Sequence, residues 1–133
     1  MVPLFSRSAQ SKNILIDTDG STKLADFGVS RELNQSGMAR SMVGTPLFMA
    51  PEVLEGEAYS AVADVWSLGI VALHIANGEI PRRGTAVREL MRIVIAEPAP
   101  RVLKPERWSP AFASFVERCL VKVGDPPSVS VLC

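Results

Sequence analysis

The sequence predicts an α+β fold that is mostly α-helical, with one short β-hairpin ahead of a long irregular segment. The hairpin is indicated by β-prone runs at residues 13–16 and 22–25, which flank a stretch rich in Asp and Gly. The helices are indicated by three segments after residue 60 that carry apolar residues at helical spacing. At 133 residues the chain has room for one domain.

The hairpin is expected to turn within the five residues from Asp17 to Ser21, where Gly20 and two aspartates suit a tight turn. From residue 26 to about residue 48 the sequence has little periodicity and is rich in Gly, Ser and Asn. A long irregular loop inside a compact domain is usually functional or disordered. The sequence therefore predicts that this segment is either functional or disordered.

The longest expected helix runs from Ser60, a capping residue, to Asn77, and Gly78 ends it. Its apolar residues fall on both sides of the helix: Val62, Val65, Trp66, Ile70 and Leu73 on one face, and Leu68, Val71 and Ile75 on the other. A helix that is apolar on nearly all sides belongs in a core. We expect it at the centre of the fold.

Two amphipathic helices are expected after it, at residues 85–97 and 110–120. The first carries Val87, Leu90, Met91 and Val94 at helical spacing. The second has Ser109 as its cap and Pro110 in its first turn. We expect both apolar stripes to face the core rather than to dock a partner.

The charge balance excludes some classes of partner. Lys plus Arg and Asp plus Glu number 14 each, so the sequence gives no electrostatic signature for nucleic acid or an anionic membrane. The most apolar stretch, residues 62–75, is shorter than a membrane span and contains Asp64 and His74. The N-terminus lacks the basic region of a signal peptide. We expect a cytoplasmic protein without a membrane span.

Short motifs recur in a characteristic order after the expected hairpin. They are Asp26-Phe27-Gly28, Gly44-Thr45-Pro46, Met49-Ala50-Pro51-Glu52 and Asp64-Val65-Trp66-Ser67-Leu68-Gly69, with Asn13 upstream. Their order and spacing resemble the protein-kinase signature set. The resemblance is to eukaryotic serine/threonine protein kinases, and residues 98–122 resemble the germinal-centre (Hippo-like, sterile-twenty-like) group. It implies a protein-kinase-like C-lobe whose long irregular segment is the activation segment.

The resemblance also implies cofactors and a metal site. Asn13 and Asp26 would bind Mg²⁺, and Asp26-Phe27-Gly28 would lie beside the phosphates of ATP. Thr45 would line the site of the substrate hydroxyl, with a simple turn residue as the alternative. The partners implied are a protein substrate or a partner kinase.

Other family positions imply regulation and structure. Ser41 stands where related kinases take an activating phosphate, which Arg7 would bind, although Ser41 is equally well read as a solvated loop serine. Glu52 would pair with an arginine expected after residue 122, but the chain there reads Val-Gly-Asp-Pro-Pro-Ser. Asp64 would bind the catalytic-loop backbone, with local capping of its own helix as the alternative.

The chain departs from the family at the catalytic loop. The base position is Ser8 and the lysine position is Gln10, so no catalytic residue of this loop is intact. A serine cannot accept the substrate proton as a carboxylate does, and general acid–base help is worth on the order of 10² to 10⁴ in rate. A neutral Gln10 also leaves the transferred phosphoryl group less neutralised.

These features predict a kinase C-lobe fragment at residues 11–122, with non-matching segments at 1–10 and 123–133. The parent enzyme would transfer the γ-phosphate of ATP to protein Ser or Thr, and this chain would be inactive alone. The alternative is a non-catalytic, pseudokinase-like module that docks a partner kinase or substrate. Because the expected central helix lacks the helices that wrap it in kinases, we also predict aggregation or association through its exposed apolar surface.

Overall fold

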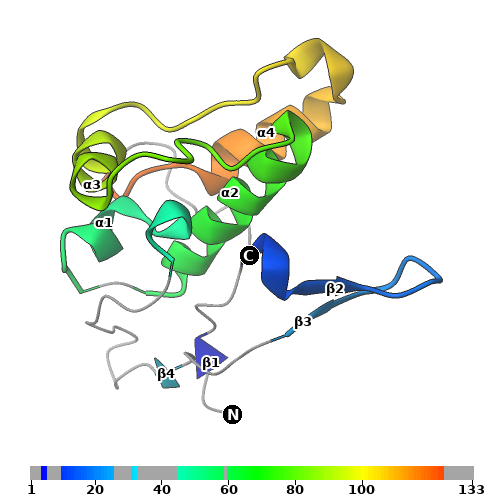
Figure 1. Cartoon of the computed structure of the whole chain (residues 1–133), viewed down its shortest axis with the longest axis horizontal. Helices are drawn as coiled ribbons and strands as arrows, with labels where there is room; N and C mark the ends of the chain where they lie inside the picture. The colour runs from blue at the N-terminus through cyan, green and yellow to red at the C-terminus, as the bar shows by residue number, and fades with distance from the viewer. Residues whose placement is uncertain (1–3, 6–9, 26–30, 33–44, 59, 125–133) are drawn as a thin grey trace.

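A computed structural model of the chain describes residues 4–5, 10–25, 31–32, 45–58 and 60–124. Figure 1 shows a helical body from which a β-hairpin projects. The elements in chain order are β1 (Leu4–Phe5), the 3-10 helix η1 (Ser11–Asn13), β2 (Ile14–Ile16), β3 (Thr22–Leu24), β4 (Arg31–Glu32), the 3-10 helix η2 (Pro46–Phe48), α1 (Pro51–Leu54), α2 (Val62–Asn77), α3 (Val87–Ala96), the 3-10 helix η3 (Pro105–Arg107) and α4 (Pro110–Cys119).

The projecting hairpin consists of β2 and β3, which pair antiparallel with Leu15 opposite Lys23. Its turn closes through hydrogen bonds from the Asp17 N–H to the Ser21 carbonyl (2.8 Å) and from the Gly20 N–H to the Asp17 carbonyl (3.0 Å). Gly20 has φ +83°, a conformation that glycine adopts without steric cost. The predicted hairpin is confirmed. A second, two-residue pairing joins β1 to β4.

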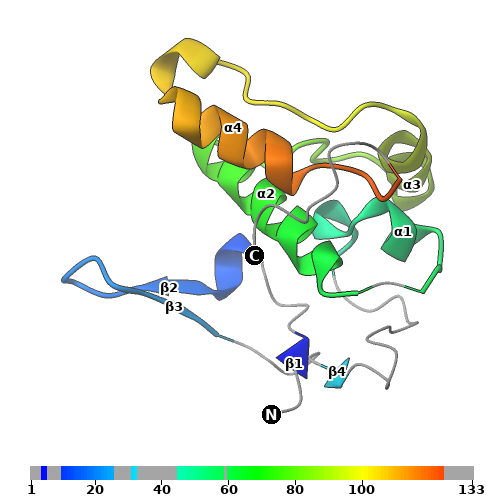
Figure 2. The same ribbon diagram turned by 180° about the vertical axis from the view of Figure 1, so that it is seen from behind.

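The central helix is α2, as its sequence predicts. It ends at Gly78, which has φ 78° and donates its N–H to the His74 carbonyl (3.0 Å). At the other end the Ser60 hydroxyl accepts the Val62 N–H (3.3 Å). α4 lies alongside α2 in both views (Figures 1 and 2). Its own N-terminus is capped by the Ser109 hydroxyl, which accepts the Phe112 N–H (3.2 Å).

The core forms where α2 packs against α4 and η2, and where α3 packs against α1 and η2. Its most completely buried large side chains are Leu54, Val71, Leu73, Val116 and Cys119. The amphipathic stripes of α3 and α4 face this core, since Leu90, Val94 and Val116 are buried. That prediction is confirmed, except that Val87, in the first turn of α3, is 55% exposed. The predicted α+β class, mostly helical with one hairpin, is confirmed as well.

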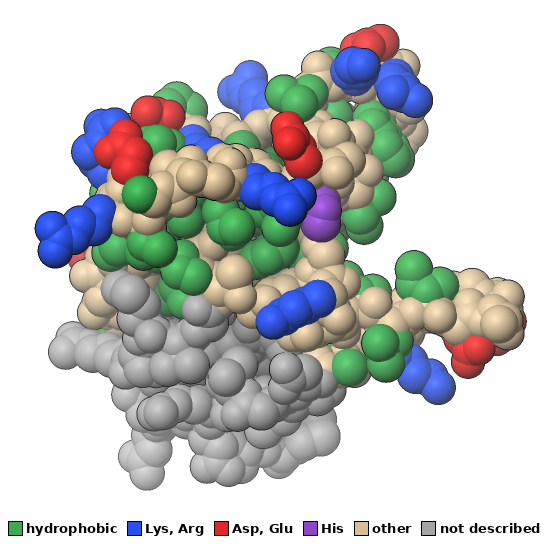
Figure 3. Space-filling model, viewed as in Figure 1, with side chains coloured by type: hydrophobic (Ala, Val, Ile, Leu, Met, Phe, Trp, Pro, Cys, Tyr) green, Lys and Arg blue, Asp and Glu red, His purple; other side chains and the backbone are tan. Residues whose placement is uncertain are grey.

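The expectation that α2 is buried on nearly all sides is wrong for one strip of the helix. Leu68 is 42% exposed and Ile75 is 65% exposed, because no element of the described residues covers that side. The hairpin exposes Leu15, Ile16 and Leu24, and hydrophobic side chains are visible along it in Figure 3. Among the described residues no helix has both the length and the apolarity needed to cross a membrane.

Candidate functional site

The candidate site is built around η1, which joins Gln10 to the first strand of the hairpin. The Asn13 N–H donates to the Gln10 carbonyl (2.9 Å) and closes the 3-10 turn. The Ala25 N–H, at the end of the hairpin, donates to the Asn13 carbonyl (2.8 Å). Gln10 and Asn13 are both 7% exposed. The short turn therefore buries both Gln10, expected at the family's lysine position, and Asn13, an expected Mg²⁺ ligand, three positions apart.

Gln10 and Thr45 are brought together, although 35 residues separate them. The Thr45 hydroxyl donates to the Gln10 side-chain oxygen at 2.9 Å. Gln10, which the sequence analysis expects at the family's lysine position, thus binds the threonine expected at the substrate-hydroxyl site. The bond joins η1 to the start of η2, the two segments that the sequence assigns to the catalytic loop and to substrate binding.

A serine on α2 holds η2 in place, and sequence reasoning missed it. The Ser67 hydroxyl lies 2.8 Å from the Phe48 carbonyl and 3.2 Å from the Ala63 carbonyl, both of which are acceptors. The contact to Phe48 connects the central helix to the last residue of η2, three positions after Thr45. A lone serine within an apolar helix was the available signal, because a hydroxyl among apolar side chains needs an acceptor.

A second missed contact fixes η1 to α2. The Ser11 hydroxyl lies 2.6 Å from Nδ1 of His74, across 63 residues of sequence. Both side chains are partly buried. Ser11 directly follows Gln10, so this pair helps to set the position of the turn that carries Gln10 and Asn13. Nothing in the local sequence pattern around either residue predicts the pairing.

Glu52 lies in the first turn of α1 and is 7% exposed. Burial raises the pKa of its carboxyl, its own backbone N–H opposes that shift, and the like charges of Glu55 and Glu57 add to it. Within the described part of the chain, no Lys or Arg forms an ion pair with Glu52. The pairing expected for Glu52 from the family resemblance stays a prediction.

Asp64 occupies the first turn of α2 and is partly buried. Its backbone N–H donates to the Ala61 carbonyl (3.1 Å). A carboxylate at this end of a helix is favoured by the helix dipole, as the sequence suggests. Its expected contact with the catalytic loop stays a prediction.

The remaining predicted site residues lie outside the described residues. They are Arg7, Ser8, Asp26, Phe27, Gly28 and Ser41. The structure therefore describes Asn13 but not Asp26 of the expected Mg²⁺ pair. Ala25, which precedes Asp26, is hydrogen-bonded to the Asn13 backbone as described above. Among the described residues, no three His, Cys, Asp or Glu side chains gather as a metal site.

Comparison with known proteins decides the family. The family model described as protein kinase domain matches residues 7–126. The chain belongs to the protein kinase family. Over 119 residues it is 43% identical to the serine/threonine-protein kinase pakH of Dictyostelium discoideum. This match covers 90% of this chain and 23% of that protein. It is also 43% identical over 120 residues to the serine/threonine-protein kinase hippo of Drosophila melanogaster, covering 90% of this chain and 18% of that protein.

The predicted resemblance to serine/threonine kinases of the Hippo-like group is thereby confirmed. The chain spans about a fifth of the length of these curated relatives. Protein kinase domains use ATP and Mg²⁺. Asn13 is the only expected Mg²⁺ ligand that lies among the described residues. Its side-chain amide is buried and offers an oxygen, the type of ligand that Mg²⁺ prefers.

The bond between Gln10 and Thr45 makes the first testable prediction. Thr45→Val should lower the free energy of unfolding by about 1–3 kcal/mol, because it leaves the buried amide of Gln10 without its partner. Gln10→Ala should cost a comparable amount, and the double variant less than the sum of the two. Urea unfolding followed by the fluorescence of the buried Trp66 measures all three.

Thr22→Val, at an exposed threonine of the hairpin, is the matched control and should change stability by less than about 0.5 kcal/mol. If the two single effects at Gln10 and Thr45 add to within about 0.5 kcal/mol, the hydrogen bond contributes no coupling and the assignment is wrong.

Proposed function

We propose that this chain is the substrate-side part of a serine/threonine kinase domain, and that it does not transfer phosphate by itself. In the parent domain, the γ-phosphate of ATP would pass to a Ser or Thr hydroxyl of a protein substrate. The observation that carries the proposal is the contact of Gln10 with Thr45 (2.9 Å). It supports a site in which a neutral amide stands at the family's lysine position and contacts the threonine expected to line the substrate-hydroxyl site.

The residues at the expected metal, lysine and base positions would each affect phosphoryl transfer. Asn13, buried beside the hairpin, would offer an amide oxygen to Mg²⁺, and Asp26 would offer a carboxylate. ATP–Mg²⁺, when bound, supplies the phosphoryl group and the metal charge. Gln10 cannot neutralise the developing phosphoryl charge as an ammonium does. Ser8 cannot act as the carboxylate base, so proton removal from the substrate hydroxyl lacks its usual acceptor.

Incubation of the chain with ATP, Mg²⁺ and a generic basic protein substrate tests this proposal. We expect phosphate incorporation no higher than with Asp26→Ala, because the base and the lysine are both replaced. A full-length Hippo-like kinase in parallel shows that the assay works. Turnover by the chain that Asp26→Ala abolishes would overturn the proposal.

Exposed apolar side chains favour the alternative, a non-catalytic module that docks a partner kinase or substrate. Leu68 and Ile75 lie exposed on α2, and Val87 lies exposed on α3. Covering exposed apolar side chains is favourable. These three side chains support association with another part of a kinase or with a second protein.

A further inference from the structure

A solvent-open hollow lies where the C-terminal end of α3 meets the segment that follows α4. Its volume is about 540 Å³, within the range of roughly 300–1,000 Å³ common for ligand sites. Its lining is mostly apolar and consists of Ala96, Glu97, Pro98, Ala99, Leu120, Val121 and Lys122. None of these residues belongs to the candidate site around Gln10, so the hollow is not explained by kinase chemistry.

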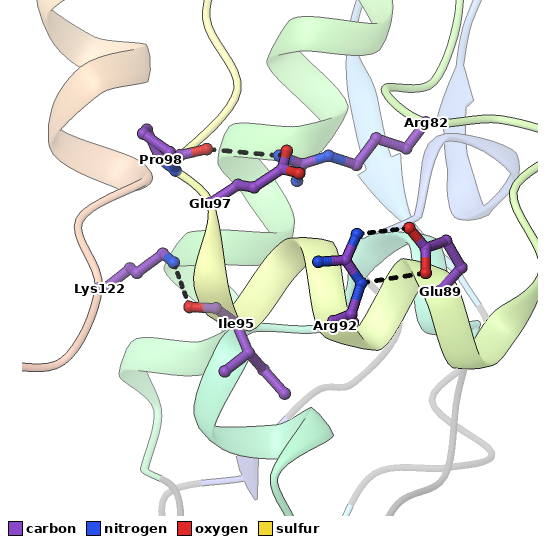
Figure 4. Close-up of polar contacts among 7 residues, drawn as sticks. All are labelled: Arg82, Glu89, Arg92, Ile95, Glu97, Pro98 and Lys122. Atoms are coloured by element: carbon purple, nitrogen blue, oxygen red, sulfur yellow. Dashed lines mark hydrogen bonds and ion pairs between the residues drawn. The ribbon is translucent and has the colours of Figure 1, made fainter.

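Lys122 supplies a fixed positive charge at this hollow. Its Nζ donates to the Ile95 carbonyl at 2.6 Å, in the last turn of α3 (Figure 4). An ammonium group has three donors. Within the described residues no carboxylate lies within ion-pair distance of Nζ, and no further acceptor is bonded to it. The other two N–H groups have no partner among the described residues, and the side chain is partly buried.

The other charged side chain of the lining, Glu97, is 51% exposed and lies beside a cation. Glu97 forms an ion pair with Arg82 at 3.7 Å, and the same guanidinium donates to the Pro98 carbonyl at 3.3 Å. The Arg82 side chain is only 19% exposed, so it fixes residues 97 and 98 as one wall of the hollow. Of the two charged side chains in the lining, only Lys122 has no ion-pair partner among the described residues.

Figure 4 also shows a different ion pair on α3, between Arg92 and Glu89 at 2.6 Å. Both side chains are largely exposed, at 63% and 48%. A pair of this kind is screened by water and contributes little. Lys122 differs from this pair, because it is partly buried beside apolar residues and has no ion-pair partner within the described part of the chain.

We propose that the hollow is a docking site for an acidic peptide segment of a partner protein. A carboxylate of the peptide binds the two available N–H groups of Lys122. The aliphatic side chain next to it packs against Ala96 and Ala99, which are accessible apolar residues of the lining. Charge complementarity selects the acidic group, and the apolar walls select its neighbour. This docking site does not depend on the proposed kinase function, since none of its residues takes part in phosphoryl transfer.

Binding of a labelled peptide to the immobilised chain tests the proposal. The probe is a fluorescein-labelled hexapeptide with leucine followed by glutamate at its centre and alanines elsewhere. The matched peptide has glutamine in place of the glutamate. We expect saturable binding of the acidic peptide below about 1 mM, at least about fivefold tighter than that of the glutamine peptide. The difference should shrink as the salt concentration rises.

Three variants locate the site. Lys122→Met keeps the aliphatic stem and removes the charge, so it should abolish the preference for glutamate. Ala96→Phe, at an exposed position, should block the hollow and weaken binding of both peptides. Lys23→Met removes an exposed lysine of the hairpin and should change nothing. Circular dichroism of each variant separates loss of binding from loss of fold.

Equal binding of the two peptides would overturn the proposal, as would equal binding by Lys122→Met and the unaltered chain. Absence of saturable binding by the folded chain up to about 1 mM would also overturn it. Lys122 would then serve only to cap the C-terminus of α3. The peptide-binding experiment and the phosphorylation assay are independent. Either the docking proposal or the proposed kinase function can therefore be refuted without affecting the other.

Discussion

Replacing Gly69 by alanine is expected to lower the free energy of unfolding by about 1–3 kcal/mol, and replacing it by valine to lower it further. Gly69 lies inside α2, where α4 ends against it. A Cβ atom at this position would stand 2.8 Å from Cβ of Cys119 and 2.8 Å from both Cγ and Cδ2 of Leu120. Such distances force the two helices apart or push Leu120 out of its buried position. Urea unfolding followed by tryptophan fluorescence measures the change.

The expected loss of stability is opposite in sign to the usual effect of replacing glycine by alanine in a helix. In an ordinary helix interior, alanine in place of glycine stabilises by roughly 0.5–1 kcal/mol. A second variant tests the cause, since Leu120→Ala removes two of the three atoms that the new Cβ would meet. Gly69→Ala should therefore cost less in the Leu120→Ala background than alone. A Gly69→Ala variant that is more stable than the parent chain would show that α2 and α4 do not approach as described.

The elements that the sequence predicts well are those specified by neighbouring residues. The hairpin follows from two β-prone runs around Asp17 to Ser21. The end of α2 follows from Gly78, and the start of α4 follows from Ser109. In each case, side chains or dihedral preferences within a few residues determine the backbone. The two-residue strands β1 and β4 were not predicted, because runs of two residues carry no periodicity.

The contacts that shape the candidate site join residues that lie far apart in the sequence. Gln10 meets Thr45, Ser11 meets His74, and Ser67 meets Phe48, each across 19 or more residues of sequence. No local pattern specifies such pairs, since they depend on how the elements pack. The family resemblance predicted the roles of Gln10 and Thr45 but not their hydrogen bond. It also gave no reason to expect a serine and a histidine to join η1 to α2.

The exposure of the apolar side chains of α2 also could not be predicted from the local sequence. The apolar residues of α2 predict a central helix, and Trp66, Ile70 and Leu73 are buried as expected. Sequence spacing cannot show which faces of a helix the rest of the chain covers. Leu68 and Ile75 are therefore exposed in spite of their apolar character, which supports the predicted association through this helix.

Glu52→Gln is expected to raise the free energy of unfolding at neutral pH by about 1–3 kcal/mol. The carboxyl of Glu52 is buried without an ion-pair partner among the described residues, and its pKa is raised above the ordinary value of 4.5. The main cause is desolvation of the charged form, and the neighbouring Glu55 and Glu57 increase the shift. Glutamine keeps the shape of the side chain and removes the charge that burial disfavours.

The pH dependence follows from the direction of the shift. Below pH 4.5 the carboxyl is protonated in both the folded and the unfolded chain, so burial carries no charge penalty. As the pH rises through 4.5 the unfolded chain loses this proton first, and the folded chain loses it only at its higher pKa. Between these two values Glu52 lowers the stability progressively, and above them the full penalty remains. The advantage of Glu52→Gln should therefore be small in acid and grow towards neutral pH.

Urea unfolding of the two chains across this pH range measures the difference. Glu106→Gln, at an exposed glutamate of η3, is the control and should show no comparable gain. A constant difference between Glu52→Gln and the parent chain at all pH values would contradict the assignment. A loss of stability at neutral pH would mean that the Glu52 charge is compensated in the folded chain. The missing arginine would then have been replaced by another cation, and the buried carboxylate would stabilise this fold instead of opposing it.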